Sequence, residues 1–229
     1  MRLLFEKEGV AVWISHLDLM RLLARAFRRA GIRLKHSQGF TPHPELSVVM
    51  PLSVGVSSVC ELADFTLAEG ETVTPVQIPA RMNPVLPAGL RVLDCYEGGQ
   101  KAGRLALLRS RLMLVYDPEA EIGVAGPQDL ALNVVPALRA LFARPALVVE
   151  KHSKKGPVET DLAPMIREIA VSQTDDRTLC LELLGTAQNP TLNPLLLITA
   201  IENYLPECKP NFVTCHRLEI YDAEGKVFR

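Results

Sequence analysis

Hydrophobic and polar positions along the chain predict two rounds of the same element order, and the first round fills residues 1–97. Apolar runs at 2–5 and 10–14, interrupted at Glu8 and Gly9, predict a strand or a tight hairpin. Apolar residues then recur at helical spacing from Leu19 to Phe27, so we predict a helix over about 16–30. The remaining first-round predictions are strands over 32–37, 47–56, 59–67 and 90–96 and a proline-interrupted helix over 74–86.

The second round follows a predicted hinge at 98–103, where three of six residues are glycine. Its predicted strands cover 105–116, 146–151, 164–174, 177–184 and 212–221, and its predicted helices cover 128–142 and 193–205. Each round has three predicted strands between its two helices, one more than the β-α-β-β-α-β order of the split antiparallel arrangement, and we interpret both rounds as that unit. We therefore predict an α+β protein with two tandem ferredoxin-like units, an N-terminal domain at 1–99 and a C-terminal domain at 104–229.

Composition supports a folded chain and excludes several classes. Among 229 residues, 48% are hydrophobic and 22% are charged, as in globular proteins. No apolar run reaches the roughly 18 residues of a membrane helix, and charged residues from Glu6 to Glu8 stand where a signal peptide would be apolar. We therefore expect a cytoplasmic protein with no membrane association. Five cysteines without a C-x-x-C pair indicate neither a disulfide framework nor a cysteine-ligated metal.

Charge is distributed unevenly along the chain. The net charge is −1, but residues 1–40 hold eight basic and three acidic side chains, while 41–100 hold seven acidic and two basic ones. Arg21, Arg25, Arg28 and Arg29 fall on the polar face of the first predicted helix. This face is either a binding surface or simply solvated.

Three tracts carry candidate chemistry. In the first, Ser15 stands at the N-cap of the predicted helix and Asp18 at its box position, which places His16 beside an anion-binding helix N-terminus. The competing interpretation is that these residues only cap the helix. The second tract, KHSQGFTPHP, combines Lys35, His36, Gln38, Phe40 and His43 in one loop. An exposed Phe beside Lys and His suits base stacking with phosphate contact, whereas turn chemistry or a buried Phe40 would explain the tract without function.

The third tract, KHSKKGP, places Lys151, Lys154 and Lys155 in a predicted basic loop. If the two rounds are pseudo-repeats, this loop follows the first helix and strand of its unit, as the loop from Lys35 does in the first unit. We therefore expect the two loops to form one shared cationic cleft. A solvated turn is the alternative.

Catalytic and cofactor signals are weak. His16, His36 and His43 lack the i, i+4 spacing of a metallohydrolase, so no metal site is predicted, and no cofactor motif such as a phosphate loop or G-x-G-x-x-G occurs. His16 or His43 remains a candidate general base for a metal-independent ribonuclease, because a histidine titrates near neutral pH.

The motifs WISHLDLMRLLARAFRRAGI, HSQGFTPHPELS and PLSVGV resemble a bacterial family of radical SAM-linked proteins, a domain family of unknown function. The resemblance continues through LPAGLRVLD, the KKG tract and HRLEIYD. It implies a partnership with cobalamin-binding radical SAM proteins, to which members are sometimes fused, and genes beside those of an E/G-type endoribonuclease and a ribosomal protein. Two positions depart from the family pattern: Glu45 replaces a common lysine and Ala163 a common arginine, and both changes weaken a cationic cleft.

Together these observations favour an accessory, non-catalytic RNA-binding module that presents transfer or ribosomal RNA to a radical SAM enzyme. The expected nucleic-acid-binding residues are His16, Arg21, Lys35, His36, Gln38, Phe40, His43, Lys151, Lys154 and Lys155. The alternatives are the ribonuclease and a protein-only adaptor of the radical SAM partner.

Overall fold

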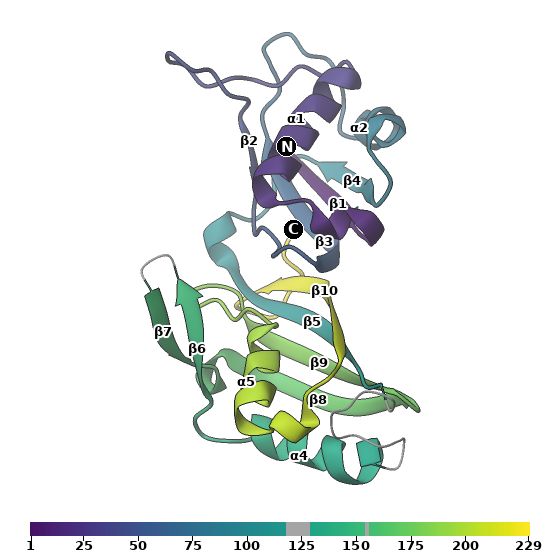
Figure 1. Cartoon of the computed structure of the whole chain (residues 1–229). Coiled ribbons are helices and arrows are strands. Elements are labelled where there is room, and N and C mark those ends of the chain that lie inside the picture. The colour runs from purple at the N-terminus through teal and green to yellow at the C-terminus, as the bar shows by residue number, and fades with distance from the viewer. Residues whose placement is uncertain (118–128, 154–155) are drawn as a thin grey trace. The chain divides into compact units, whose positions relative to one another are not determined.

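The computed structural model describes residues 1–117, 129–153 and 156–229, which form two compact units (Figure 1). Unit 1 comprises Met1–Arg104 together with Phe228–Arg229, and unit 2 comprises Leu105–Val227. Within each unit the described strands pair antiparallel and α-helices accompany the sheet. The protein therefore belongs to the α+β class, as predicted.

Unit 1 has a sheet in the order β4-β1-β3-β2. Its strands are β1 (Arg2–Lys7), β2 (Leu46–Val48), β3 (Val56–Phe65) and β4 (Leu90–Tyr96). Its helical segments are η1 (Gly9–Trp13), α1 (His16–Arg29), α2 (Gln77–Met82), η2 (Asn83–Val85) and η3 (Ala102–Arg104). Helices α1 and α2 cover one face of the sheet, and the core of unit 1 lies between them and the strands (Figure 1).

Helix α1 forms where the sequence predicts it, because its start signal and its apolar face agree. The Ser15 hydroxyl accepts a hydrogen bond from the Asp18 backbone N–H at 3.2 Å and donates one to the Asp18 carboxylate at 2.8 Å. Leu19, Leu23 and Phe27 are buried against the sheet. Since this face is fixed in the core, the arginines on the opposite face must point outward.

The prediction of a strand over 10–14 is wrong, because this segment forms the short helix η1. The cause is Lys7, which is 1% exposed and donates from Nζ to the carbonyls of Val12 at 3.2 Å and Ile14 at 3.0 Å. A buried ammonium group needs such acceptors. The chain therefore coils back over the end of β1 instead of extending it.

The other predicted segments of unit 1 are shorter than expected. Residues 32–37 form only single bridges, Leu34 to Leu67 and His36 to Pro44, and β2 ends at Val48. Pro51, which lacks an N–H donor, follows in the segment predicted to continue that strand. The helix predicted over 74–86 is split into α2 and η2 at Pro84.

Unit 2 has a sheet in the order β10-β5-β9-β8, and a separate hairpin, β6-β7. Its strands are β5 (Leu105–Val115), β6 (Val148–Ser153), β7 (Gly156–Asp161), β8 (Ile166–Asp175), β9 (Thr178–Thr186) and β10 (Phe212–Asp222). Its helical segments are a π-helical turn (Leu130–Val134), α4 (Val135–Phe142), η5 (Ala163–Met165), α5 (Leu196–Tyr204) and η6 (Pro206–Cys208). Helices α4 and α5 contact each other on one face of the sheet (Figure 1).

The hairpin β6-β7 corrects the predicted basic loop over 151–157. Lys151 pairs with Val158 inside the hairpin, and its side chain is exposed. The two lysines Lys154 and Lys155 lie outside the described residues. The predicted helix over 128–142 begins within the described chain as a π-helical turn and becomes α-helical from Val135, with Pro136 in its first turn.

Candidate nucleic-acid interface

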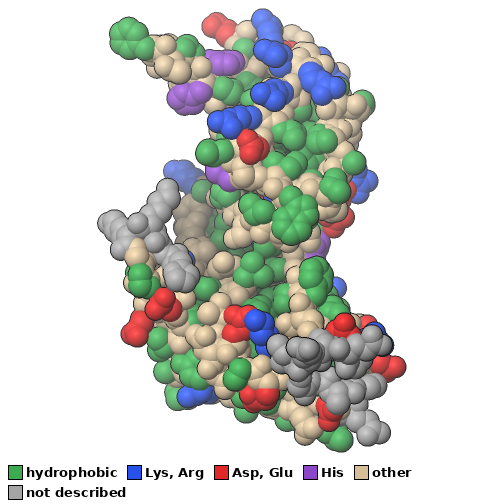
Figure 2. Space-filling view, in the orientation of Figure 1, with side chains coloured by type: hydrophobic (Ala, Val, Ile, Leu, Met, Phe, Trp, Pro, Cys, Tyr) green, Lys and Arg blue, Asp and Glu red, His purple; other side chains and the backbone are tan. Residues whose placement is uncertain are grey.

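A row of exposed arginines follows the outer face of α1. We call Arg21, Arg25, Arg28 and Arg29 the basic ridge. Figure 2 shows Lys and Arg side chains gathered over the part of unit 1 where α1 lies. Arg21 donates to the Asp18 carboxylate at 3.0 Å, whereas Arg28 and Arg29 have no carboxylate partner among the described residues.

Asp18 is the one acidic side chain within α1. The hydroxyl of Ser15, the guanidinium of Arg21 and the charge of Arg25 hold the pKa of its carboxyl below the usual value. Asp18 therefore stays ionised and offsets charge at the N-terminal half of the ridge. The C-terminal half, at Arg25, Arg28 and Arg29, keeps most of its positive charge.

Other basic residues of the first forty are neutralised by ion pairs or buried. Arg2 lies 2.6 Å from Asp64, Arg33 3.4 Å from Glu71 and Lys35 3.0 Å from Glu45, and Lys7 is buried. The local excess of positive charge read from the sequence is thus concentrated on α1.

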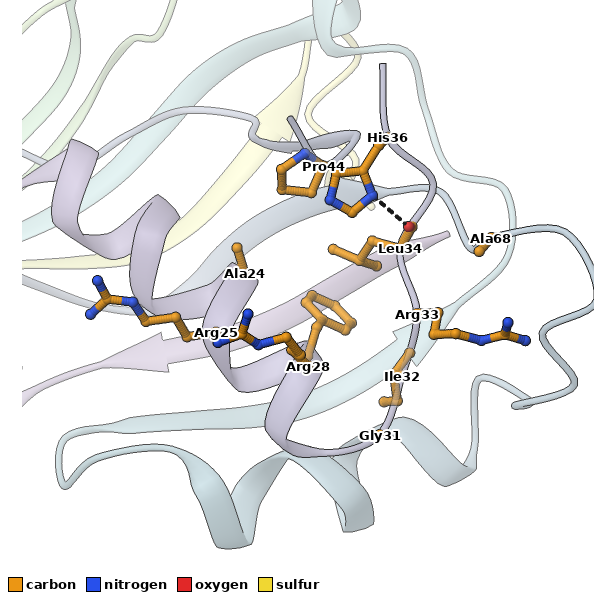
Figure 3. Close-up of a pocket in the computed structure, with 11 residues that line it drawn as sticks. Ala24, Arg25, Arg28, Gly31, Ile32, Arg33, Leu34, His36, Pro44 and Ala68 are labelled. Atoms are coloured by element: carbon orange, nitrogen blue, oxygen red, sulfur yellow. Dashed lines mark hydrogen bonds between the residues drawn. The ribbon is translucent and has the colours of Figure 1, made fainter. Parts of the chain in front are cut away.

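A groove of about 810 Å³ lies between the ridge and the segment that follows α1 (Figure 3). We call it the hairpin-side groove, because one of its edges, at His36 and Pro44, adjoins the hairpin-like loop 36–44 of unit 1. Its apolar surface comes from Ala24, Phe27, Ile32, Leu34, Pro44 and Ala68. Arg25 and Arg28 project from α1 on one side, and His36 lies beside Pro44 at another edge (Figure 3). The groove thus combines an apolar floor with a cationic rim.

The ring of His36 is oriented by a backbone carbonyl. Its Nδ1 lies 3.0 Å from the Leu34 carbonyl oxygen. Because a carbonyl oxygen can only accept, Nδ1 carries the proton, and Nε2 of the neutral ring is an acceptor. The groove edge therefore offers one fixed polar group beside its arginines.

A second groove of about 730 Å³ lies on the other side of α1, against the segment 84–87. Arg21, Arg25 and Arg29 line it together with Asp18. Arg25 lines both grooves, so the ridge divides them. An anionic chain that followed α1 would meet a cation at each turn of the helix.

Residues 36–44 form a hairpin-like loop that projects from unit 1, and we call it the projecting loop (Figure 1). Ser37 ties its two sides: its backbone N–H donates to the His43 carbonyl at 2.8 Å, and its hydroxyl lies 2.9 Å from His43 Nδ1. At the tip, Gly39 has φ of +137°, a conformation that side chains disfavour. Phe40 beside it is fully exposed. The interpretation of Phe40 as a core residue is therefore wrong.

Lys35 and Glu45 lie opposite each other at the base of the projecting loop. The hydrogen bond from Lys35 lowers the pKa of the Glu45 carboxyl. Glu45 therefore neutralises Lys35 at neutral pH, and Lys35 adds little net charge to this surface.

The predicted site residues do not all converge. Lys35, His36, Gln38, Phe40 and His43 share the projecting loop and its base. His16 is exposed at the other end of α1, and a rise of 1.5 Å per residue puts roughly 18 Å of helix axis between it and Arg28. Lys151 belongs to unit 2 and the projecting loop to unit 1, so their shared cleft stays a prediction.

His16, His36 and His43 do not form a common metal site. Across residues 1–117, 129–153 and 156–229, no three His, Cys, Asp or Glu side chains gather as a metal-binding cluster. His43 is instead held by Ser37 within the loop.

No helix in the described part of the chain is long and apolar enough to cross a membrane.

Sequence reasoning about the site missed Arg25, Arg28 and Arg29. Their signal was present as the basic face of the predicted helix, but it was also compatible with a solvated surface. The deciding facts are non-local: Glu71 and Glu45 neutralise Arg33 and Lys35, while the ridge arginines lie beside the grooves.

Comparison with known proteins places the chain in a family. The model for "Uncharacterized protein conserved in bacteria (DUF2344)" matches residues 1–194, and the chain belongs to this family. This agrees with the predicted bacterial family of unknown function. No curated protein sequence matches the chain.

Two solved structures share a distant likeness. One is a chain in the crystal structure of a Cbf5-Nop10-Gar1 complex, with 9% identity, coverage of 94% of this chain and 47% of that one, and a TM-score of 0.48. The other is in the archaeal box H/ACA sRNP Nop10-Cbf5 complex, with 12% identity, coverage of 92% and 50%, and a TM-score of 0.34. This chain spans about half the length of both.

Proposed function

We propose that the protein is an accessory RNA-binding module whose contact surface is the basic ridge of α1 together with the projecting loop. The observation that carries the proposal is the cluster of Arg25, Arg28 and Arg29, which have no carboxylate partner within 4 Å in the described chain. Arginine on a helix face binds phosphate groups through its planar array of donors.

The exposed aromatic ring narrows the ligand from any polyanion to nucleic acid. Phe40 is fully exposed at the tip of the projecting loop, so both faces of its ring are accessible to a ligand. Bases stack on such rings in RNA-binding proteins, while cations contact the phosphates. Phe40 and the arginines supply both kinds of contact from unit 1.

The enzyme partner in this proposal is a cobalamin-binding radical SAM protein. Its support is the family resemblance of the sequence motifs, and the RNA would be a transfer or ribosomal RNA. In this arrangement the chain itself performs no reaction. His16 would contact a phosphate at the N-terminus of α1, and Lys151 would contribute from unit 2.

The test is binding of total bacterial RNA to the purified full-length protein, followed by variants. We expect retention that weakens as salt rises, because released counterions drive phosphate binding. The triple variant Arg25→Ala/Arg28→Ala/Arg29→Ala should bind about tenfold more weakly at moderate salt. Unchanged binding by this variant would contradict the proposed surface.

Arg91→Ala is the matched control. Arg91 is an exposed arginine of unit 1 on β4, where it pairs with Glu6 at 2.8 Å. We expect its removal to leave RNA binding unchanged. If Arg91→Ala weakened binding as much as the triple variant, the loss of affinity would reflect the overall positive charge of the protein and not the basic ridge.

A protein-only adaptor is the second candidate, and three exposed apolar side chains near the start of unit 1 favour it. Val10, Trp13 and Leu17 are 74%, 70% and 66% exposed. Val10 and Trp13 are three residues apart in η1 and share one face of that turn. Co-purification of a protein partner that survives nuclease and is lost in Trp13→Ser would favour the adaptor over RNA binding.

We also propose that each unit has the ferredoxin-like fold. The support is sheet order: β4-β1-β3-β2 in unit 1 and β10-β5-β9-β8 in unit 2 each follow the 4-1-3-2 pattern of a β-α-β-β-α-β unit. The hairpin β6-β7 would then be an insertion after the first helix of unit 2.

A further inference from the structure

The hairpin-side groove has the dimensions of a ligand site. Its volume of about 810 Å³ lies within the range of roughly 300–1,000 Å³ that small-molecule pockets occupy. A groove of this size exceeds what one side chain from a partner would fill, and it is open enough to admit part of a chain.

The chemistry of its lining selects a ligand with a flat apolar part and an anionic part. The floor open to a ligand consists of the part-exposed side chains Ala24, Pro44 and Ala68, whereas Phe27, Ile32 and Leu34, which also line the groove, are at most 7% exposed. Arg25 and Arg28 form the rim on the α1 side, while Arg33 on the opposite side is neutralised by Glu71 at 3.4 Å (Figure 3). Positive charge is therefore available on one side of the groove only.

A nucleotide matches this asymmetry. Its base is a flat group that packs against apolar and guanidinium surfaces, and its phosphate lies to one side. His36 adds a polar group of fixed orientation at the groove edge, which can hydrogen-bond to the edge of a base.

The base that enters must be unpaired. Bases in an RNA duplex are stacked and covered on both faces, so only a single strand, loop or bulge can place a base on the groove floor. Phe40 projects from the loop whose base borders the same groove, at His36 and Pro44, and can stack on a neighbouring unpaired base.

We propose that the hairpin-side groove binds an unpaired nucleotide of RNA, with the base on the apolar floor and its phosphate at Arg25 and Arg28. This inference rests on the proposed function and names its substrate class as single-stranded or looped RNA. It also assigns the groove a role beyond electrostatic attraction.

The test compares a fluorescein-labelled 12-nucleotide RNA as a single strand and annealed to its complement, by anisotropy with the full-length protein. We expect the single strand to bind about tenfold more tightly than the duplex at the same salt. Ala24→Phe, which fills the groove from α1 and leaves every arginine in place, should remove this preference by weakening single-strand binding about tenfold. Duplex binding should not change.

Ala137→Phe is the control, since Ala137 is also a half-buried helical alanine but lies on α4 of unit 2. Thermal unfolding of both variants identifies loss of folding, and Ala68→Leu, which fills the groove from outside α1, replaces Ala24→Phe if that variant unfolds. Equal binding of single strand and duplex, or a retained preference in the groove-filled variant, would overturn the inference and leave the proposed function intact. No binding of either RNA would overturn both.

Discussion

At the scale of single residues, the proposed site depends on which charged side chains lack an ion-pair partner within the protein and which aromatic side chains are exposed. The Phe40 ring is fully exposed to solvent. Arg28 and Arg29 have no acidic partner among the residues described. Lys35, by contrast, is paired with Glu45. Phe40 and the Lys35–Glu45 pair therefore each give a separate testable prediction.

Phe40→Ala should weaken single-stranded RNA binding without changing stability. Loss of a stacked base costs about 1–3 kcal/mol of binding free energy. Because the side chain is fully exposed, the melting temperature should stay the same. Anisotropy titration and thermal unfolding measure the two quantities, and unchanged affinity would remove Phe40 from the interface.

Glu45→Gln should strengthen RNA binding at neutral pH, because it releases Lys35 from its ion pair. Lowering the pH should also break the Lys35–Glu45 ion pair, because it protonates the Glu45 carboxylate. The folded-state pKa of Glu45 lies below its usual value of 4.5, so the pair stabilises the loop base above that pH and is lost as pH falls through the lowered pKa. The affinity of the variant relative to wild type at pH 7 tests this point, and weaker binding would contradict it.

At the scale of secondary-structure elements, α1 could be predicted from the sequence because all its signals are local. The Ser15 cap, the Asp18 box position and the apolar recurrence up to Phe27 lie within one stretch. Segment η1 could not be predicted, because its form depends on where the side chain of Lys7 is buried. The hairpin β6-β7 was hidden for a related reason: a lysine-rich stretch suits a loop unless a partner strand pairs with it.

Ser15→Ala should destabilise unit 1 by about 1 kcal/mol, the usual cost of losing an N-cap. The hydroxyl of Ser15 satisfies the backbone N–H of Asp18 in the first turn of α1. Chemical denaturation measures the change in the free energy of unfolding. Ser15→Asp, which retains a capping oxygen, should recover most of the loss, and no recovery would argue against a capping role.

Lys7→Met should destabilise unit 1 by about 3 kcal/mol, because it removes the donor to the buried carbonyls of Val12 and Ile14 and the positive charge that attracts Glu61. Burial lowers the pKa of Lys7, while the charge of Glu61 opposes that shift. The double variant Lys7→Met/Glu61→Gln should lose less stability than the single variant. Equal losses in a denaturation series would show that the two charges are not coupled.

At the scale of the whole molecule, the α+β class agrees with the sequence prediction, but the position of the proposed RNA surface could not be predicted from the element order. The α+β class follows from local periodicity in each half. The site depends on non-local facts, such as Glu71 neutralising Arg33 across 38 positions and the segment 31–36 lying beside α1 to form a groove. The shared cleft of Lys35 and Lys151 requires both units together and stays a prediction.

The most direct test of RNA binding by the ridge is the salt dependence of affinity for a single-stranded RNA. The logarithm of the binding constant should fall linearly with the logarithm of the salt concentration. Each phosphate contact on a single strand should contribute about 0.7 to the magnitude of this slope. Removal of Arg25, Arg28 and Arg29 together should therefore lower the magnitude of the slope by about 2. A slope near zero for wild type, or an identical slope for the triple variant, would contradict the account.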